Sequence, residues 1–374
     1  MRLCITRSER YAYSETFIRD QIDGLSKRME VHSVHSGRLP ERAESGERLS
    51  PFLYRVLHKF IKAATGQRNN YFGNYGLKKF FREKKMDVVL ANYGISAVHI
   101  MPVCKALNLP LIVVFHGHDA TDKRLLRAYA SRYRQLFEYS AAIVAVSNDM
   151  RDKLMTLGAD AGKISVIPCG VDLRKFSPSP EKKEALFLAV GRFVEKKGPL
   201  ITIRAFHEVW KRHPEAKLMM VGAHRGLYQK CVALVNSLDM QEAVSFPGAV
   251  THEEVRKLMG RAFAFVQHSV TAANGDMEGT PVGLLEAAAS GLPVVSTFHG
   301  GINDAVIHER TGYLTAEGDV AAMAGYMIRL LEDPVQAALM GKATRNHITL
   351  NYDQEKQLNK LSALIVAAQT AKSK

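Results

Sequence analysis

Two glutamates eight positions apart stand in the stretch DMEGTPVGLLEAAASG, residues 276–291. Glu278 falls in a glycine-containing loop. Thr280 is expected to cap a helix that begins with Pro281 and ends before Gly291. A helix start attracts phosphate through its free N–H groups, and carboxylates accept hydrogen bonds from sugar hydroxyls. The stretch predicts a phosphate-and-sugar site, although a surface turn that leads into an amphipathic helix has the same pattern.

Two further stretches are candidates for the same site. Each follows an apolar run that predicts a strand, and loops at the carboxyl ends of such strands bind ligands. GRFVEKKG, residues 191–198, places Arg192 and Lys197 just before a predicted helix start at Pro199. Two cations near a helix N-terminus suit a diphosphate, and an exposed basic loop is the alternative. His116, in HGHD, follows the run LIVVF, and a lone histidine is more often a hydrogen-bonded structural residue. Neither half has a G-x-G-x-x-G loop after its first strand or a Walker A lysine loop, so NAD binding and ATP hydrolysis are not supported.

Apolar runs that predict strands alternate with stretches that predict helices along most of the chain. Continuous apolar strands between helices indicate a parallel sheet covered on both faces, which binds ligands at the carboxyl ends of its strands. The expected strands are 2–6, 31–34, 87–92, 111–115, 141–147, 164–168, 185–191, 217–222, 244–248, 263–269, 293–297 and 312–315. The expected helices include 14–25, 95–107, 123–139, 148–157, 199–212, 226–238, 252–259, 282–290, 320–331 and 354–371.

A polar stretch at 171–184 interrupts this alternation and predicts a linker. The length of 374 residues, at roughly 150 residues per domain, also indicates two domains. We therefore expect an α/β protein with two doubly wound, Rossmann-like domains that face a cleft. The expected parts are an N-terminal domain at 1–176, a C-terminal domain at 181–350 and a C-terminal helix at 351–374 that packs back on the first domain.

The net charge of +14 is concentrated in the first half of the chain. Residues 1–175 hold 29 Lys and Arg against 17 Asp and Glu, a difference of +12, whereas residues 176–374 hold 22 against 20, a difference of +2. This asymmetry favours an anionic partner of the first half: membrane phospholipid, a lipid diphosphate or nucleic acid. A basic surface without a dedicated partner is the alternative.

The four cysteines form no C-x-x-C pair, which argues against a zinc site or a disulfide framework and fits a reducing cytosol. The N-terminus lacks the apolar core of a signal peptide, and no apolar run approaches the roughly 20 residues of a spanning helix. We expect a cytoplasmic protein without a bound metal or cofactor, peripheral on the inner face of the cytoplasmic membrane.

The membrane expectation comes from residues 49–64, whose apolar positions follow one helical stripe. Arg55, Lys59 and Lys62 lie off that stripe, and a further basic cluster follows at 78–85. A basic amphipathic helix can lie on an anionic bilayer, and these three residues are our candidates for contact with the acceptor or the membrane. A helix that faces the core and carries a solvated basic side has the same pattern.

Several motifs occur together in a fixed order. They are IPCGVD, GRFVEKKG, EGTPVGLLEAAASG, PVVST and the pair Gly300-Gly301. In this combination essentially the whole chain resembles the retaining GT-B glycosyltransferases of family four. The segments SETFI, near the N-terminus, and NGDMEGTPVGLLEAAASG look most like the bacterial exopolysaccharide branch of this family, of the colanic-acid type. The resemblance implies a nucleotide-sugar donor held mainly by the C-terminal half, a lipid-linked saccharide acceptor held by the N-terminal half, and catalysis in the cleft.

The resemblance also implies a role for each candidate residue. Arg192 and Lys197 would stabilise the donor diphosphate as it becomes the anionic leaving group. Glu278 would bind sugar hydroxyls and support the oxocarbenium-like centre, Glu286 would accept from the ribose hydroxyls, and His116 would reach the sugar. The favoured account is front-face attack without a protein nucleophile. The expected donor-binding residues are Arg192, Lys197, Glu278, Gly279, Thr280, Pro281, Val282 and Glu286.

Two features depart from the family pattern. Ser14-Glu15-Thr16 stands near the place where many relatives carry a double-glycine loop. Asp276-Met277-Glu278 looks like an acidic metal motif of the other glycosyltransferase fold, but Arg192 and Lys197 already provide charge for a diphosphate, so we expect no metal.

The expected function is transfer of a hexosyl unit, from UDP-hexose or, next, GDP-mannose, to a growing exopolysaccharide or lipopolysaccharide. A sugar-nucleotide epimerase is an alternative because such enzymes share the double-Rossmann architecture. A nucleic-acid-binding protein is another alternative, although the chain lacks a basic motif interleaved with aromatic residues, and we expect no nucleic-acid partner.

Overall fold

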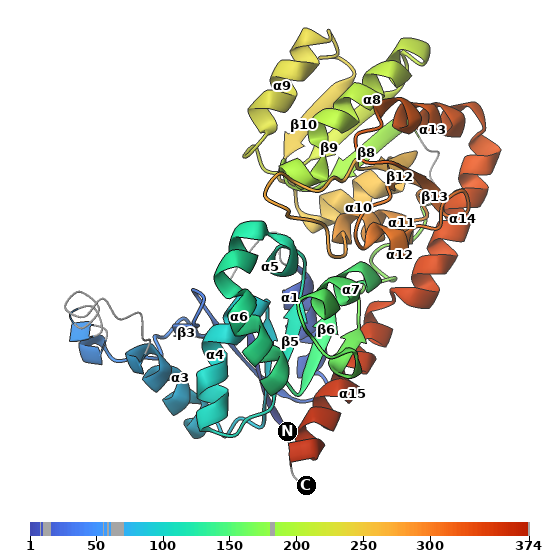
Figure 1. Cartoon of the computed structure of the whole chain (residues 1–374). Coiled ribbons are helices and arrows are strands. Elements are labelled where there is room, and N and C mark those ends of the chain that lie inside the picture. The colour runs from blue at the N-terminus through green and yellow to red at the C-terminus, as the bar shows by residue number, and fades with distance from the viewer. Residues whose placement is uncertain are drawn as a thin grey trace. The chain divides into compact units, whose positions relative to one another are not determined.

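The computed structural model describes residues 1–7, 9, 16–54, 56–57, 60, 71–179 and 184–372. The chain forms two compact units, one of Met1–Ile167 with Gln357–Lys374 and one of Pro168–Lys356. Each unit is built around one sheet with helices on both faces (Figure 1). The expected division at residues 176–181 falls inside the second unit.

The sheet of the first unit has the strand order β3-β2-β1-β4-β5-β6-β7, and all its strands are parallel except β3, which pairs antiparallel with β2. The order reverses between β1 and β4, which is where doubly wound sheets bind ligands. The strands are β1 (Arg2–Thr6), β2 (Glu30–His35), β3 (Arg42–Ala43), β4 (Val88–Asn92), β5 (Leu111–Phe115), β6 (Ala142–Ala145) and β7 (Ile164–Val166).

Helices cover both faces of this sheet, and its central strands β4, β5 and β6 are buried along their whole length. The helices of the first unit are α1 (Thr16–Ser26), α3 (Tyr71–Glu83), α4 (Gly94–Ala106), α5 (His118–Thr121), α6 (Lys123–Tyr139), α7 (Asn148–Thr156) and the 3₁₀ turn η1 (Ala161–Lys163). Asp122 caps α6 by accepting from Leu125 N, and Ser147 caps α7 by accepting from Met150 N.

The second sheet is parallel throughout, with the order β10-β9-β8-β11-β12-β13 and the reversal between β8 and β11. Its strands are β8 (Leu186–Val190), β9 (Lys217–Val221), β10 (Val244–Gly248), β11 (Ala264–Val266), β12 (Val294–Thr297) and β13 (Gly312–Thr315). Its helices are η2 (Glu195–Lys197), α8 (Pro199–Arg212), α9 (Tyr228–Ser237), α10 (His252–Arg261), α11 (Val282–Ala289), α12 (Ile302–Ala305), α13 (Val320–Glu332) and α14 (Pro334–Asn351).

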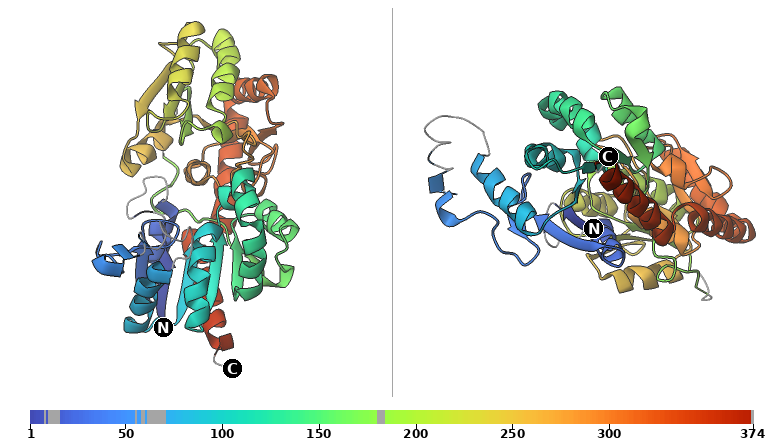
Figure 2. Two further views of the ribbon diagram at one scale, coloured as in Figure 1. Left: turned by 60° about the vertical axis from the view of Figure 1, so that its left-hand side comes forward. Right: turned by 90° about the horizontal axis from the view of Figure 1, so that it is seen from below.

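The last helix, α15 (Gln354–Lys372), begins in the second unit and continues as part of the first. Its Leu358 packs so closely on Gly24 of α1 that a Cβ at position 24 would lie 2.3 Å from Leu358 Cδ1. Arg28 adds two hydrogen bonds to Asn359 Oδ1, at 3.1 and 2.8 Å. Figure 2 shows α15, in dark red, running along the first unit towards the end where β1 begins.

The expectation of two doubly wound α/β halves is confirmed. The short strand β3 was not expected, because the polar stretch 37–48 has no strand-like alternation; its two residues pair antiparallel with β2. Among the described residues, no helix has both the length and the apolar character needed to cross a bilayer.

Candidate active site

Two consecutive lysines follow strand β8 and enter the interior of the second unit. The 3₁₀ turn η2 places Lys196 and Lys197 on the same side of the loop, with side chains only 10% and 16% exposed. Gly198 ends the turn at φ 53°, and a Cβ there would lie 1.8 Å from His268 O, so only glycine fits. This close approach brings the lysine turn against the loop that follows β11.

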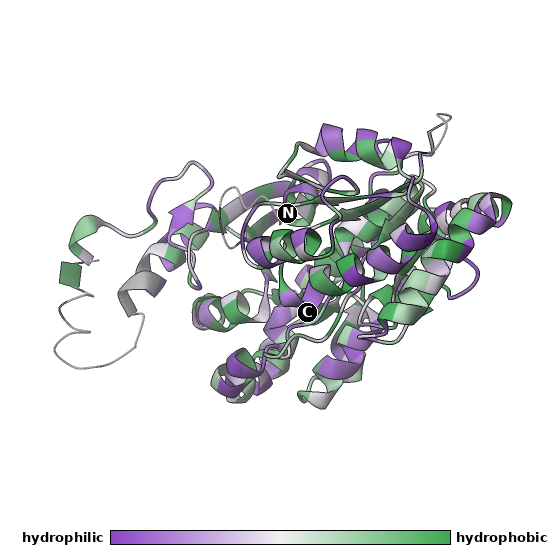
Figure 3. Ribbon diagram, turned by 90° about the horizontal axis from the view of Figure 1, so that it is seen from above, coloured by the Kyte–Doolittle hydropathy of each residue, from purple (hydrophilic) through white to green (hydrophobic). Residues whose placement is uncertain are grey.

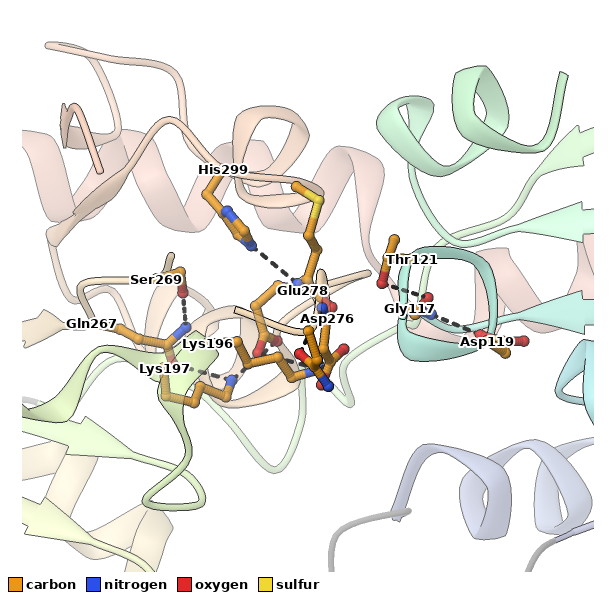
Figure 4. A network of polar contacts seen from close by, with 12 residues as sticks. Gly117, Asp119, Thr121, Lys196, Lys197, Gln267, Ser269, Asp276, Glu278 and His299 are labelled. Atoms are coloured by element: carbon orange, nitrogen blue, oxygen red, sulfur yellow. Dashed lines mark hydrogen bonds and ion pairs between the residues drawn. The ribbon is translucent and has the colours of Figure 1, made fainter. Parts of the chain in front are cut away.

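Both lysines meet the carboxylates of the loop before α11 (Figure 4). Lys197 Nζ lies 3.1 Å from Glu278 Oε2, and Lys196 Nζ lies 3.0 Å from Asp276 Oδ1 and 3.9 Å from Glu278 Oε1. Burial opposes ionisation of Glu278, but the charges of Lys197 and Lys196 outweigh it and hold the pKa of this carboxyl below its usual range. Burial also lowers the pKa of the Lys197 amine, and the Glu278 charge opposes that shift.

Glu278 Oε1 is buried and accepts no hydrogen bond from the described residues. A buried acceptor without a donor costs free energy, about 1–3 kcal/mol for a neutral group and more for a charged one. Such an atom in a native structure requires an explanation, and a catalytic role or a bound water or ligand that supplies the donor is the usual one.

Gln267 and Ser269 complete the polar network on the side of β11. Lys197 Nζ donates to Gln267 Oε1 at 3.2 Å, and Gln267 Nε2 donates to Ser269 Oγ at 2.6 Å. A shallow hollow, open to solvent, lies at the carboxyl end of β8. It is lined by Gly191, Arg192, Lys197, Pro199, Thr202 and Gln267. The structure therefore brings the two predicted cations, Arg192 and Lys197, to one hollow.

The main chain of Glu278 is held from both sides. Its N–H donates to His299 Nε2 at 3.1 Å. Its carbonyl oxygen lies under Gly300, where φ is 47° and a Cβ would come within 2.3 Å of that oxygen. Gly300 is thus required by a close approach, which gives the glycine pair a physical reason.

The helix after Glu278 starts later than expected. Pro281 has φ −78° and ψ 96° and is itself the N-cap of α11, so Thr280 does not cap the helix and the first helical residue is Val282. Thr280 precedes a proline, which disfavours helical backbone there, and ψ 96° keeps Pro281 extended. No side chain among the described residues caps this helix start. Gly279 and Pro281 are buried, Thr280 and Val282 are partly buried, and Glu286 lies buried in α11.

A second polar network lies at the carboxyl edge of the first sheet, without lysines. Asn92 Nδ2 donates to Thr6 O at 3.0 Å, so its Oδ1 faces His116 Nε2 at 2.8 Å. His116 therefore donates from Nε2 and keeps a lone pair on Nδ1. Burial lowers the pKa of His116 to about 4, so the ring is neutral at neutral pH.

The network of the first unit also contains a buried carboxylate, which accepts hydrogen bonds from the backbone. Asp119 accepts from three main-chain N–H groups: Gly94 at 2.9 Å, His116 at 3.1 Å and Gly117 at 3.1 Å. Both of its oxygens are engaged. Asp119 therefore shapes the loop that presents His116.

Sequence reasoning missed several members of these networks. Lys196 was passed over although it stands beside Lys197, because the 3₁₀ turn that directs both inward is not visible in the sequence. Asp276, which was not among the predicted site residues, is the partner of Lys196. Four other members carried no signal beyond their places near the carboxyl ends of predicted strands: Asn92, Asp119, Gln267 and His299.

Other predicted site residues lie outside the described residues. They are Arg55, Lys59, Lys62, Ser14 and Glu15. Thr16 is the first residue of α1.

The fold matches solved glycosyltransferase-type structures along the whole chain. The structure of Anabaena Alr3699/HepE in complex with UDP and glucose aligns with a TM-score of 0.78 and 16% identity, over 98% of this chain and 100% of that one. A sucrose-phosphate synthase from Thermosynechococcus elongatus aligns with a TM-score of 0.79 and 19% identity, over 99% and 100%. The two Rossmann-like units thus form the GT-B architecture.

The sequence comparisons identify the family. Residues 172–347 match Glycosyl transferases group 1, and residues 14–175 match Glycosyltransferase Family 4. The putative colanic acid biosynthesis glycosyltransferase WcaL of Escherichia coli is 30% identical over 76% of this chain and 71% of that protein. The amylovoran biosynthesis glycosyltransferase AmsK of Erwinia amylovora is 27% identical over 94% and 96%. The chain belongs to the group 1 glycosyltransferases, with a family 4 N-terminal half, and the predicted family is confirmed.

Proposed function

We propose that this glycosyltransferase moves a hexosyl unit from a nucleotide sugar, with retention of anomeric configuration, to a lipid-linked saccharide of exopolysaccharide or lipopolysaccharide synthesis. The observation that carries the proposal is Glu278 Oε1, a buried carboxylate oxygen beside two lysines that accepts no hydrogen bond from the part of the chain that the structure describes. A hydroxyl of the transferred sugar supplies that donor. The ionised carboxylate then faces positive charge as it develops at the anomeric carbon.

The donor diphosphate occupies the hollow beside β8 in this proposal. Arg192 and Lys197 line that hollow, and they stabilise the negative charge that develops on the leaving group. The first turn of α11, which no described side chain caps, adds the N–H groups of Val282 and Gly283, whereas Pro281 has none. Glu286, one turn into α11, accepts hydrogen bonds from the ribose hydroxyls.

His116 contributes from the first unit. Its Nδ1 lone pair, left by the Nε2 bond to Asn92, accepts a hydrogen bond from a hydroxyl of the transferred sugar. A neutral ring suits this role because both nitrogens of a protonated imidazole are donors. The first unit also binds the acceptor.

UDP-hexose is the favoured donor, and GDP-mannose is second. UDP is present in the HepE complexes that share the fold. A GDP-mannose-dependent mannosyltransferase of Corynebacterium glutamicum is 30% identical over 50% of this chain. The names of WcaL and AmsK, colanic acid and amylovoran biosynthesis, support an exopolysaccharide acceptor.

A thermal-shift panel of UDP, UDP-glucose, UDP-galactose, GDP and GDP-mannose, with ADP as the control, tests the donor site. A ligand at 100 times its Kd stabilises the folded state by about 2.7 kcal/mol. We expect the uridine compounds to raise the melting temperature most. Stabilisation by the guanosine compounds alone would assign GDP-mannose as the donor in place of UDP-hexose. No response to any nucleotide would contradict the proposal.

The reaction class is tested with the nucleotide sugar that responds. Proton NMR of the first-formed product reports the anomeric configuration, and retention is expected. Incubation of the donor without acceptor should leave its sugar unchanged apart from slow hydrolysis. An isomerised nucleotide sugar would favour an epimerase instead.

We propose further that the segment around residues 52–60 contacts an anionic membrane that holds the acceptor. Phe52, Leu53 and Phe60 are 74%, 71% and 69% exposed, and Leu57 is exposed as well. The described residues of this segment are coloured mainly hydrophobic in Figure 3. Residues 49–82 contain seven Lys and Arg and no Asp or Glu. Exposed apolar side chains in a basic stretch are typical of interfacial membrane binding.

Vesicle flotation tests this surface. The double variant Phe52→Ser, Leu53→Ser should lose binding to vesicles that contain phosphatidylglycerol, and wild type should bind pure phosphatidylcholine weakly. Leu339→Ser with Leu350→Ser, two exposed leucines of α14, is the matched control and should bind like wild type. Equal binding by both double variants would contradict the assignment.

A further inference from the structure

The Glu278 backbone is held by a histidine that is itself oriented by a second carboxylate. His299 follows β12, and its side chain is fully buried. His299 Nε2 accepts from Glu278 N at 3.1 Å, and His299 Nδ1 lies 2.6 Å from Glu317 Oε1. Glu317 comes from the loop after β13. Three separate segments of the second unit therefore meet at this histidine.

Hydrogen-bond direction fixes the tautomer of His299. A main-chain N–H can only donate, so Nε2 must present a lone pair to Glu278 N. Nδ1 must then carry the proton, which it donates to Glu317. If the proton moved to Nε2, two N–H groups would point at each other and the buried Glu278 N–H would lose its acceptor. Glu317 is the group that prevents this exchange.

Glu317 is in turn held in place by its surroundings. Its Oε2 accepts from Thr271 N at 2.8 Å, and its Oε1 accepts from Thr271 Oγ1 at 3.2 Å. The next residue, Gly318, donates its N–H to His268 Nε2 at 2.8 Å. Burial opposes ionisation of Glu317, but hydrogen bonds from Thr271 and His299 outweigh it and keep its pKa below the usual range. The carboxylate is therefore a fixed, ionised acceptor for His299.

We propose that His299 and Glu317 are positioning residues for the transfer reaction. Glu317 holds His299 as the Nδ1-protonated tautomer, and His299 Nε2 holds the main chain of Glu278 so that Oε1 stays aimed at the sugar. This role rests on the proposed function of Glu278. Neither residue lines the hollow that holds Arg192 and Lys197, so their loss acts on the reacting geometry and leaves nucleotide binding intact.

Kinetics of Glu317→Ala and Glu317→Gln test this role. In Glu317→Ala, His299 is no longer held as the Nδ1-protonated tautomer. We expect kcat to fall about tenfold to hundredfold, which is the size of loss that misplacement of a catalytic group by about 1 Å can cause. KM for the donor and the Kd of the nucleoside diphosphate should change less than about twofold. Glu317→Gln keeps one acceptor oxygen, which can accept from Nδ1–H while the amide NH2 replaces Oε2 and loses the bond from Thr271 N. This variant should melt at a lower temperature than wild type but restore kcat to within about threefold.

The matched control is His308→Ala. His308 Nδ1 accepts from Leu314 N at 2.9 Å, so this variant loses the same kind of histidine-to-backbone bond from a loop of the same unit. We expect it to melt at a lower temperature with unchanged kcat. Unchanged kcat in Glu317→Ala would overturn the proposal. An equal loss of kcat in Glu317→Gln and Glu317→Ala would also overturn the proposal, because only the charge of Glu317 would then matter.

A measurement without turnover separates this proposal from the proposed function. Imidazole ¹⁵N spectra of histidine-labelled protein, with His299 assigned from His299→Gln, should show a protonated Nδ1 and an unprotonated Nε2 at neutral pH. In Glu317→Ala the two tautomers should mix. A wild-type signal with the proton on Nε2 would refute the positioning pair whatever the enzyme transfers. Activity that survives Glu278→Gln would refute the sugar role of Glu278 alone.

Discussion

Each unit buries a carboxylate at the carboxyl edge of its sheet, but the two carboxylates are used differently. Asp119 in the first unit has both oxygens occupied by main-chain N–H groups. Glu278 in the second unit has one oxygen on Lys197 and one that accepts no hydrogen bond from the described residues. A carboxylate whose acceptors are filled stabilises a loop, whereas one with a buried unfilled acceptor is available to a ligand. Both carboxylates are buried, so burial does not distinguish them. What distinguishes the structural carboxylate from the functional one is whether both of its oxygens already accept hydrogen bonds.

The sharpest test of this comparison is Glu278→Gln. The amide keeps the shape and a bond to Lys197 but removes the charge that faces the sugar, so we expect kcat/KM to fall about 10²- to 10³-fold. Circular dichroism should show an intact fold. Glu208→Gln, at an exposed position of α8, is the control and should transfer like wild type. Equal activity of the two variants would end the functional interpretation of Glu278.

Asp119→Ala should have the opposite profile. Three main-chain N–H groups would lose their acceptor, two of them buried, and we expect about 3 kcal/mol of lost stability. Urea unfolding followed by circular dichroism measures this. Nucleotide-induced thermal stabilisation should remain, because the donor groups belong to the second unit. An unchanged unfolding midpoint would show that Asp119 is not the structural acid we describe.

His116→Ala removes one hydrogen bond to the transferred sugar, which contributes roughly 1.4 kcal/mol. We therefore expect kcat/KM to fall about tenfold. His116→Asn, which keeps a polar atom near the Nδ1 position, should recover part of the loss. Because burial lowers the pKa of His116 to about 4, its contribution should stay constant from pH 5.5 to 8. Loss of the His116 contribution with a midpoint near pH 6.5 would contradict the neutral ring.

Acid should destabilise the protein through three histidines with a lowered pKa, two in the first unit and one in the second. Burial is the main cause that lowers the pKa of His99, His116 and His268 to about 4. Between pH 6.5 and 4 the unfolded chain binds protons that the folded chain does not, so stability falls as pH falls through this window. We expect the melting temperature to drop by roughly 5–10 °C from pH 7 to pH 5.

The control for the acid effect is His99→Gln, which removes one of these groups and should reduce the drop. His99 is partly exposed and also lies near Arg132 and Arg38, whose charges disfavour its protonation. A drop of equal size in the variant would show that His99 does not contribute to the acid sensitivity.

The alternation of apolar runs and helices was enough to predict the doubly wound sheets and the loops that carry His116, Lys197 and Glu278. Each of these loops follows a parallel strand, and parallel strands end at one edge. The pairings inside the site could not be predicted. Lys196 and Asp276 are 80 positions apart, and their contact depends on the turn at Gly198, whose fit under His268 O exists only in the folded chain.

The same limit applies to the second layer of the site. Nothing in the local sequence distinguishes His299 from other histidines that follow strands, and Glu317 reads as a polar residue before a glycine turn. Their roles come from the direction of hydrogen bonds to a main-chain N–H. The start of α11 was misplaced by one residue for a related reason, because the backbone angle of Pro281, rather than its residue type, decides where the helix begins.

The packing of α15 on α1 has a consequence for synthesis of the chain. Gly24 receives Leu358, more than 330 positions later, and the first unit includes residues from both ends of the chain. A ribosome therefore completes the second unit before the last helix of the first unit has emerged. Until then, the surface around Gly24 and Leu25 lacks its cover and is available to chaperones, so the N-terminal half should be the last part of the protein to become resistant to proteolysis during translation.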